Sequence, residues 1–195
     1  MPDILPASSY SPKTGGPSFS PSNRLNRVTW SICWTLFASW TPPAFGPWRR
    51  LLLKLFGANM GRHADVRGSA RVWLPRNLTL GDRSLLAAGV NCYNMAMVTL
   101  EAGALVSHGA HLCAGSHDIR SEDFQLVAYP IVIGPEAWVA AEAFVGPGVT
   151  IGEGAVLGAR SVAFRSLEPW TVYVGNPAAA VGRREFRGSD PHAED

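Results

Sequence analysis

The side chain best suited to acid–base chemistry in this sequence is the imidazole of His117. Histidine is the natural general base near neutral pH because its unperturbed pKa lies there. Asp118 follows directly, and it could either orient the imidazole through a hydrogen bond or cap a turn. The other histidines have no such setting, and we expect them to be structural or solvated: His63, His108, His111 and His192.

His117 lies where a regular pattern in the sequence stops. An aliphatic residue recurs at every sixth position, usually followed by a small residue, most strictly at Ile133, Val139, Val145, Ile151 and Leu157. A period of six is neither the 3.6 of a helix nor the 2 of a strand, and it indicates a parallel β-helix of hexapeptide repeats. The pattern is present from Val66 to Leu112 and fails at Asp118. We therefore expect a loop over 117–130 that leaves the β-helix, and such loops often carry active-site residues.

The pattern divides the chain into five segments. We expect a disordered or extended segment at 1–21, a helical aromatic and basic segment at 22–60, the β-helix at 61–168, a cap at 169–186 and a flexible acidic tail at 187–195. The fold class is therefore mainly β. Two extra residues separate some coils, and we expect them to form bulges at corners.

The segment 22–60 predicts two amphipathic helices, from Ser22 or Asn23 to about Ser39 and from Pro47 to Phe56. The first is apolar on one side, and the second is basic on one side. Two roles stay open, and they are compatible on opposite faces. The helices could cover the open end of the β-helix, or residues 22–56 could touch a membrane surface. The residues concerned are Trp30, Trp34, Phe37 and Trp40 in the first helix, and Arg49, Arg50 and Lys54 in the second.

Composition and charge argue against several classes of function and location. The net charge of +2 in 195 residues gives no case for nucleic-acid binding. Three cysteines without CxxC spacing predict buried thiols in a reducing compartment. The longest uncharged apolar run, Val28 to Trp40, is too short to span a bilayer and has no clear cleavage site after it. We therefore expect a cytoplasmic protein.

Several segments together resemble a known family, the hexapeptide-repeat acyltransferases. They are Ile131 to Ser161, Val174 to Ala178, Asn91 to Asn94, and Cys113 to Asp118. Over residues 22 to 186 the chain is similar to colanic-acid biosynthesis O-acetyltransferases and to the galactoside and maltose acetyltransferases. The resemblance implies a left-handed β-helix, a homotrimer and acetyl-CoA as the acyl donor. It also implies O-acetylation of a sugar or lipid-linked sugar for surface polysaccharide, with no metal.

The resemblance also implies roles for individual residues. His117 matches the family's catalytic base, and Asn94 matches an asparagine that contacts the acceptor sugar, with Tyr93 as a weaker candidate. Asn94 could instead be a corner residue in a tight turn. The residues that would bind the cofactor are Trp138, Ala141, Ala159, Asn176, Pro177 and Arg183.

Other functions remain open on the same fold. A metalloenzyme of the γ-carbonic-anhydrase type would bind zinc through histidines of adjoining subunits. An N-acetyltransferase for an amino sugar would use the same base. A scaffold without activity would retain the fold alone. A lipid-linked acceptor would place the protein at the inner face of the cytoplasmic membrane.

Overall fold

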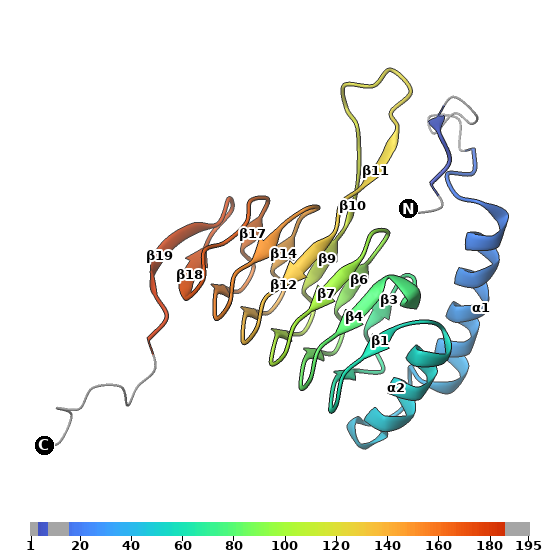
Figure 1. Cartoon of the computed structure of the whole chain (residues 1–195), viewed down its shortest axis with the longest axis horizontal. Coiled ribbons are helices and arrows are strands. Elements are labelled where there is room, and N and C mark those ends of the chain that lie inside the picture. Colours follow the sequence, from blue (N-terminus) through green and yellow to red (C-terminus); the bar gives the residue numbers. More distant parts are fainter. Residues whose placement is uncertain (1–3, 8–15, 186–195) are drawn as a thin grey trace, which may run out of the picture.

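The computed structural model describes residues 4–7 and 16–185, and in it short strands wind into a three-sided prism (Figure 1). The first side holds β1 (Asn59–Met60), β4 (Leu78–Leu80), β7 (Val98–Leu100), β12 (Ile131–Ile133) and β15 (Thr150–Ile151). The second holds β2 (Asp65–Val66), β5 (Leu85–Leu86), β8 (Leu105–Val106), β13 (Trp138–Val139), β16 (Val156–Leu157) and β18 (Thr171–Val174). The third holds β3 (Arg71–Val72), β6 (Asn91–Tyr93), β9 (His111–Cys113), β14 (Phe144–Val145) and β17 (Val162–Ala163).

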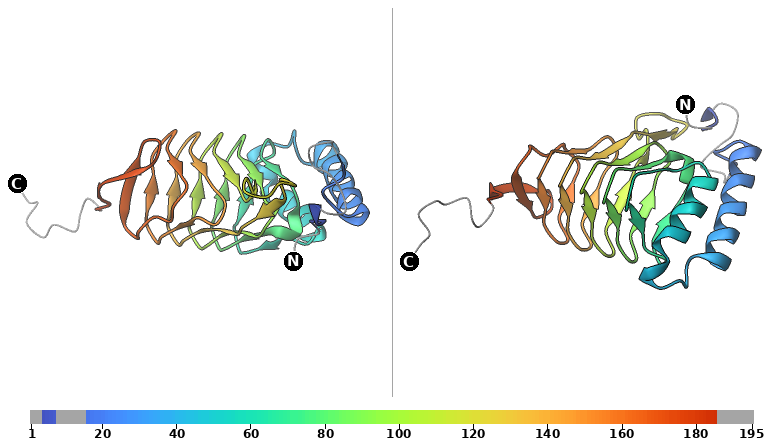
Figure 2. Two further views of the ribbon diagram at one scale, coloured as in Figure 1. Left: turned by 90° about the horizontal axis from the view of Figure 1, so that it is seen from above. Right: turned by 60° about the horizontal axis from the view of Figure 1, so that its bottom comes forward.

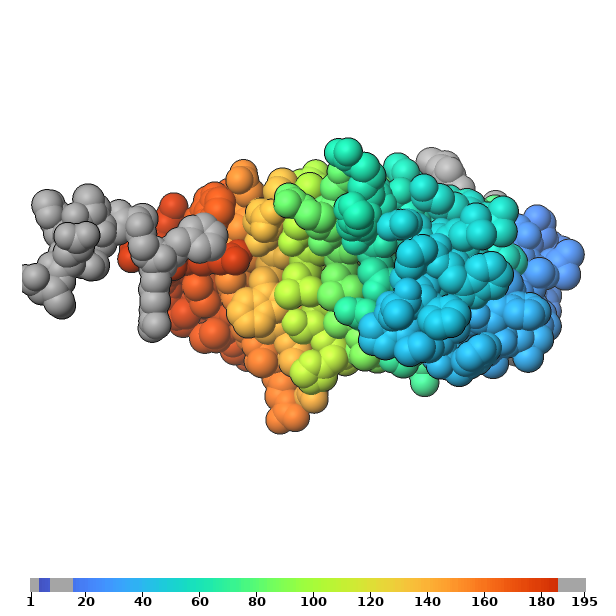
Figure 3. Space-filling view, turned by 90° about the horizontal axis from the view of Figure 1, so that it is seen from below, coloured from blue at the N-terminus to red at the C-terminus, as the bar shows by residue number. Residues whose placement is uncertain are grey.

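All neighbouring strands on these three sides run parallel, as stacked coils require. The coils form consecutive bands of colour along the molecule (Figure 3). At the last coil, β19 (Ala179–Arg183) turns back and pairs antiparallel with β18. The predicted fold class, mainly β with a parallel β-helix of hexapeptide repeats, N-terminal helices and a short C-terminal cap, is confirmed.

The predicted six-residue step places aliphatic side chains inside the prism. Leu100 pairs with Ile133, and Ile133 pairs with Ile151, so one ladder runs through successive coils. All three are fully buried. The two-residue excess before Leu80 forms the short helix η4 (Pro75–Asn77) at a corner, as expected of a bulge. Cys92 also lies inside, where burial raises the pKa of its thiol to about 12.

Two helices cover the N-terminal end of the prism, α1 (Pro21–Phe37) and α2 (Gly46–Leu55), with the short helix η3 (Pro43–Phe45) before α2 (Figure 2). Helix α1 begins earlier than expected because the hydroxyl of Ser20 accepts a hydrogen bond from the Asn23 N–H. The predicted apolar side of α1 is only partly right. Trp30 and Trp34 are buried, whereas Phe37 and Trp40 are exposed.

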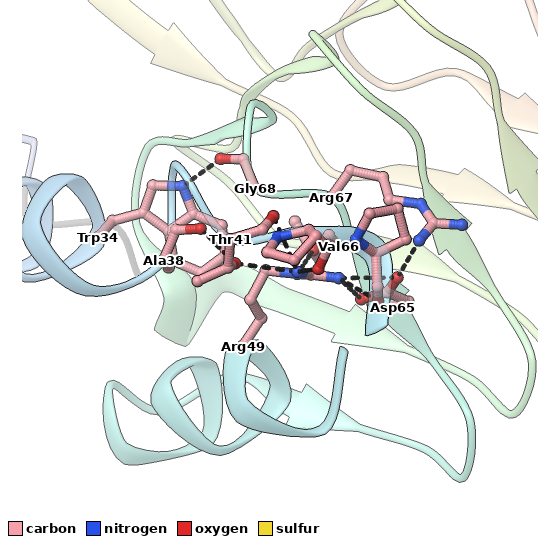
Figure 4. Close-up of polar contacts among 10 residues, drawn as sticks. Trp34, Ala38, Thr41, Arg49, Asp65, Val66, Arg67 and Gly68 are labelled. Atoms are coloured by element: carbon pink, nitrogen blue, oxygen red, sulfur yellow. Dashed lines mark hydrogen bonds and ion pairs between the residues drawn. The ribbon is translucent and has the colours of Figure 1, made fainter. Parts of the chain in front are cut away.

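Side chains of these helices satisfy backbone carbonyl groups of the first coil, which has no preceding coil to pair with. The indole N–H of Trp30 donates to the Val72 carbonyl (2.7 Å). That of Trp34 donates to the Gly68 carbonyl (3.0 Å; Figure 4). An edge left open would invite pairing with other chains. The helices therefore form the end cap that was one of the two predicted roles.

Arg49 is the centre of this cap and corrects the sequence prediction, which placed it on an exposed basic side of α2. It is fully buried. Its Nε donates to the Val66 carbonyl (2.7 Å), and its terminal nitrogens reach Thr41 Oγ1 (3.0 Å), the Pro42 carbonyl (2.8 Å) and Asp65 (3.1 Å; Figure 4). One side chain thus joins the first coil, the linker between the helices and α2.

The chain before α1 also contacts the prism. Ile4 forms an isolated antiparallel bridge with Phe19, and Phe19 packs with Met95 and Leu126. The expected disordered or extended segment therefore contains packed residues, and its remaining positions lie outside the described ones. The expected tail at 187–195 also lies outside them. Across residues 4–7 and 16–185, no helix has the length and apolar character needed to cross a membrane.

Candidate active site

The expected loop at 117–130 is largely a β-hairpin that projects from a corner of the prism (Figure 1). Strands β10 (Gly115–His117) and β11 (Leu126–Ala128) pair antiparallel between the third side and the first. At the hairpin base, any Cβ on Gly115 would collide with the Met95 side chain. Glycine at this position therefore allows the hairpin to pack closely on the coil.

The imidazole of His117 is held by the hairpin itself. Its ring stacks on Phe124, with 4.2 Å between the ring centres and 9° between the planes. Its Nδ1 lies 2.9 Å from the backbone carbonyl of Phe124. A carbonyl can only accept a hydrogen bond, so Nδ1 carries the proton and the Nε2 lone pair is left to act as a base.

A cavity of ≈ 510 Å³ adjoins this histidine. It is lined by Ser116, His117, Asp118, Ile119, Arg120, Val127, Tyr129 and Pro147. Both polar and apolar groups are present, as in sites for small organic ligands. The half-buried imidazole therefore borders a space large enough for part of a substrate.

Asp118 does not orient the imidazole in this structure. Its carboxylate accepts a hydrogen bond from the Arg120 N–H (2.9 Å), and its own N–H donates to the Gln125 carbonyl (2.8 Å). The Phe124 carbonyl occupies the Nδ1 position at which an orienting carboxylate would bind. The structure thus shows the turn-capping role for Asp118, which was the alternative.

Asn94 is also placed differently from the expected sugar contact. It is fully buried, its amide oxygen accepts from the Leu74 N–H (3.0 Å), and its amide nitrogen donates to the Leu74 carbonyl (2.7 Å). Tyr93 is half-buried and meets Trp73 edge-on, with 5.7 Å between the ring centres. In this structure Asn94 has the role of a corner residue, and it has no exposed group for an acceptor.

We expect Asn94→Ala to lower the free energy of unfolding by about 1–3 kcal/mol, because it leaves the buried Leu74 N–H without a partner and removes one of the two donors to the Leu74 carbonyl. Chemical denaturation of the purified variant measures this loss. Asn77→Ala is a useful control, since it removes a partly buried amide of the same corner that bonds only to carbonyl groups. An Asn94 variant with unchanged stability and a raised KM for the acceptor would instead support the sugar contact.

The residues expected to bind the cofactor line up along another corner, between the second and third sides. Ala141 and Ala159 occupy equivalent positions in successive coils, because the Arg160 N–H donates to the Ala141 carbonyl (2.9 Å). Asn176 and Pro177 follow β18 at the same corner of the last coil. The N–H groups of Ala141 and Ala159 make no hydrogen bond to any described residue. They are free to bind carbonyl groups of an extended ligand.

Of the two other residues expected to bind the cofactor, Trp138 lies beside this corner and Arg183 lies far from it. Trp138 is 40% exposed on the second side, and its indole N–H donates to Ser107 Oγ (2.9 Å) beside the corner. Arg183 pairs with Thr171 at the far end of β19. Arg183 is therefore separated from Asn176 and Pro177 by the width of one side of the prism.

Three residues that shape these two corners could not be predicted from the sequence. Phe124 supplies both the stacked ring and the carbonyl that hold His117. Glu142 and Arg160 form an ion pair of 2.6 Å next to Ala141 and Ala159. Hydrogen bonding to the Arg160 guanidinium lowers the pKa of the Glu142 carboxyl. All three residues have a positive φ angle, and the spacing of aliphatic residues in the repeat does not reveal such positions.

His117 and the Ala141–Ala159 row lie at different corners of the prism. His117 follows β9 and precedes β12, whereas Ala141 lies between β13 and β14. One chain thus does not bring the base and the row of free N–H groups together. Within the described part of the chain, no three His, Cys, Asp or Glu side chains are grouped so that they could hold a metal ion.

Comparison with known proteins relates this chain to acetyltransferases in sequence and in fold. No protein-family model matches the chain. A relative from Escherichia coli K12, named as the colanic acid biosynthesis acetyltransferase WcaF, is 44% identical over 158 residues, which cover 81% of this chain and 86% of the relative. The galactoside O-acetyltransferase of the same organism is 26% identical over 74% of this chain and 71% of its own. A hexapeptide-repeat acetyltransferase from Vibrio cholerae, solved with acetyl-CoA, superposes with a TM-score of 0.76 at 20% identity, covering 86% of this chain and 91% of its own.

Proposed function

This chain belongs to the hexapeptide-repeat acetyltransferases, and on that basis we propose that it transfers an acetyl group from acetyl-CoA to a hydroxyl group of a sugar. The observation that carries the proposal is the setting of the His117 imidazole. Its Nδ1 is tied to a backbone carbonyl, so its Nε2 is an available base beside a cavity. The names of the two sequence relatives support a sugar acceptor and a role in surface-polysaccharide synthesis.

We propose that His117 Nε2 takes the proton of the sugar hydroxyl as its oxygen attacks the thioester carbonyl. The negative charge that develops on the carbonyl oxygen would be stabilised by the free N–H of Ala141. The C–S bond then breaks, and the imidazolium returns its proton to the leaving sulfur. The Phe124 carbonyl would hold the positively charged ring in place during this step.

The pantetheine arm of the donor would lie along the corner that carries Ala141 and Ala159. The exposed N–H of Ala159 suits one of its amide carbonyl groups, and exposed Trp138 would border the thioester end. Asn176 and Pro177 would lie toward the nucleotide end. The position of Arg183 does not favour its predicted contact with phosphate, because it lies at the far end of β19.

We also propose a homotrimer. The base and the donor corner are separated within one chain, so a complete site needs His117 from one copy and the Ala141–Ala159 row from a neighbour. Closed threefold symmetry would give every copy one such site. A cytoplasmic enzyme that acts on a sugar or lipid-linked sugar fits this arrangement, and transfer to an amino group would use the same base.

Acceptor screening of the purified full-length chain tests the function. We expect acetyl-CoA, but not acetate, to raise the melting temperature, since a ligand stabilises the state that it binds. We expect thiol release to depend on an added sugar or lipid-linked sugar. The absence of both effects would contradict the proposal. Stoichiometric zinc with carbon dioxide hydration would favour the metalloenzyme instead.

A further inference from the structure

Helix α1 is apolar on two opposite faces, and only one of them is used by the fold. Trp30 and Trp34 point toward the first coil and are buried. The opposite face presents an apolar stripe at helical spacing, and each of its four residues is at least 56% exposed: Leu25, Val28, Ile32 and Leu36. Capping the prism explains why Trp30 and Trp34 are apolar, but it does not explain the exposed apolar stripe on the opposite side of the helix.

Further exposed hydrophobic residues lie on the linker and on α2, which lies beside α1 at the same end of the prism (Figure 2). The indole N–H of Trp48 in α2 donates to the carbonyl of Phe37 at the end of α1 (2.8 Å). We call the whole set the outer face, and beyond the stripe it includes Phe37, Trp40, Phe45, Trp48, Leu51 and Leu55. Ten of the eighteen exposed large hydrophobic residues in the described chain belong to it. This concentration indicates a contact surface, because scattered single residues would need no explanation.

Charge on this segment has one sign. The sequence contains no aspartate or glutamate from residue 4 to residue 64. The basic residues of α2 differ in exposure. Arg49 is buried in the hydrogen-bonding network of the cap, whereas Lys54 is exposed and Arg50 is half-buried. Neither Arg50 nor Lys54 forms an ion pair with a described residue. A partner that is apolar with an anionic rim would match the outer face.

We propose that the outer face docks on the surface of an anionic phospholipid bilayer. The apolar stripe would enter the boundary between headgroups and acyl chains, and Arg50 and Lys54 would bind lipid phosphates. Exposed Trp40 and Trp48 suit this boundary because the indole ring is amphipathic. The inner face of the same helices keeps the prism closed, so docking requires no unfolding of the cap.

Co-sedimentation of the full-length chain with vesicles tests the proposal. We expect binding to vesicles of phosphatidylcholine with phosphatidylglycerol, weaker binding to phosphatidylcholine alone, and release at high salt. The double variant Arg50→Gln, Lys54→Gln should bind roughly 30-fold more weakly, since each basic residue near an anionic surface contributes about a fivefold factor. The double variant Ile32→Ser, Leu36→Ser should bind at least about 10-fold more weakly.

Val181→Ser is the matched control. It removes a valine that is 61% exposed in β19, at the opposite end of the prism, and it should leave vesicle binding unchanged. Circular dichroism checks that each variant is folded, and the two charge substitutions remove no buried group. Failure of the wild-type chain to sediment with anionic vesicles would overturn the proposal. So would self-association that the Ile32→Ser, Leu36→Ser variant abolishes, because a second copy would then cover the face.

Discussion

Replacing His117 by alanine should reduce acetyl transfer by at least about 100-fold while the protein stays folded. The imidazole is half-buried on a projecting hairpin, so its loss leaves no cavity in the core. His117→Asn is a sharper variant. Its amide can still donate to the Phe124 carbonyl, but it has no Nε2 lone pair. We expect both variants to lose kcat, measured as thiol release from acetyl-CoA in the presence of the acceptor.

His63→Ala is the control for this experiment, because His63 lies at a corner outside both proposed half-sites. It should retain full activity. The shared site adds a second test. Equal mixtures of His117→Ala and Ala159→Trp chains, assembled at random, should regain activity in about one quarter of all sites, because a site with both wild-type halves arises at that frequency. Full activity of His117→Ala, or no recovery in mixtures that do assemble, would contradict the proposed roles.

Replacing Arg49 by methionine should lower the free energy of unfolding by about 3–5 kcal/mol, the usual loss when one member of a buried ion pair is removed. The substitution retains an apolar stem but removes the donor to the Val66 carbonyl and one of the two donors to the Pro42 carbonyl. Asp65 keeps Arg67 at 3.2 Å, which places the loss toward the lower end of this range. Chemical denaturation measures the change.

The neighbouring residue provides the control for Arg49. Arg50→Met makes the same substitution at a half-buried position of α2 and should alter the free energy of unfolding by less than about 0.5 kcal/mol. Arg49→Lys should recover little, because one ammonium group cannot reach the acceptors on five different residues that the forked guanidinium binds. Equal stability of Arg49→Met and Arg50→Met would mean that the buried network contributes nothing to the cap.

The β-helix was predictable because its rule is local. Each aliphatic residue such as Ile133 or Ile151 repeats the environment of the residue one coil away, so a single chain displays the pattern many times. The hairpin that interrupts the rule has no such repetition. The sequence could place His117 at the interruption, but the Phe124 carbonyl that fixes its tautomer depends on how the hairpin closes.

The contacts at the cap and corners could not be predicted from the sequence, for a different reason. Arg49 was expected on a basic surface because charged residues are seldom fully buried. It is buried because the first coil presents carbonyl groups that only side-chain donors can reach. Asn94 was expected to face a sugar, yet both of its amide groups bind Leu74 in the preceding coil. These contacts join residues from different coils or segments, so no local pattern reveals them.

The two ends of the prism determine whether the molecule can polymerise. A solenoid with open ends could in principle add further molecules head to tail, since each terminal coil offers the hydrogen-bonding edge that the next coil would use. Here the indole groups of Trp30 and Trp34 already occupy acceptors of the first edge, and β19 crosses the last one in the opposite direction. Growth into a filament is therefore blocked at both termini by parts of the same chain.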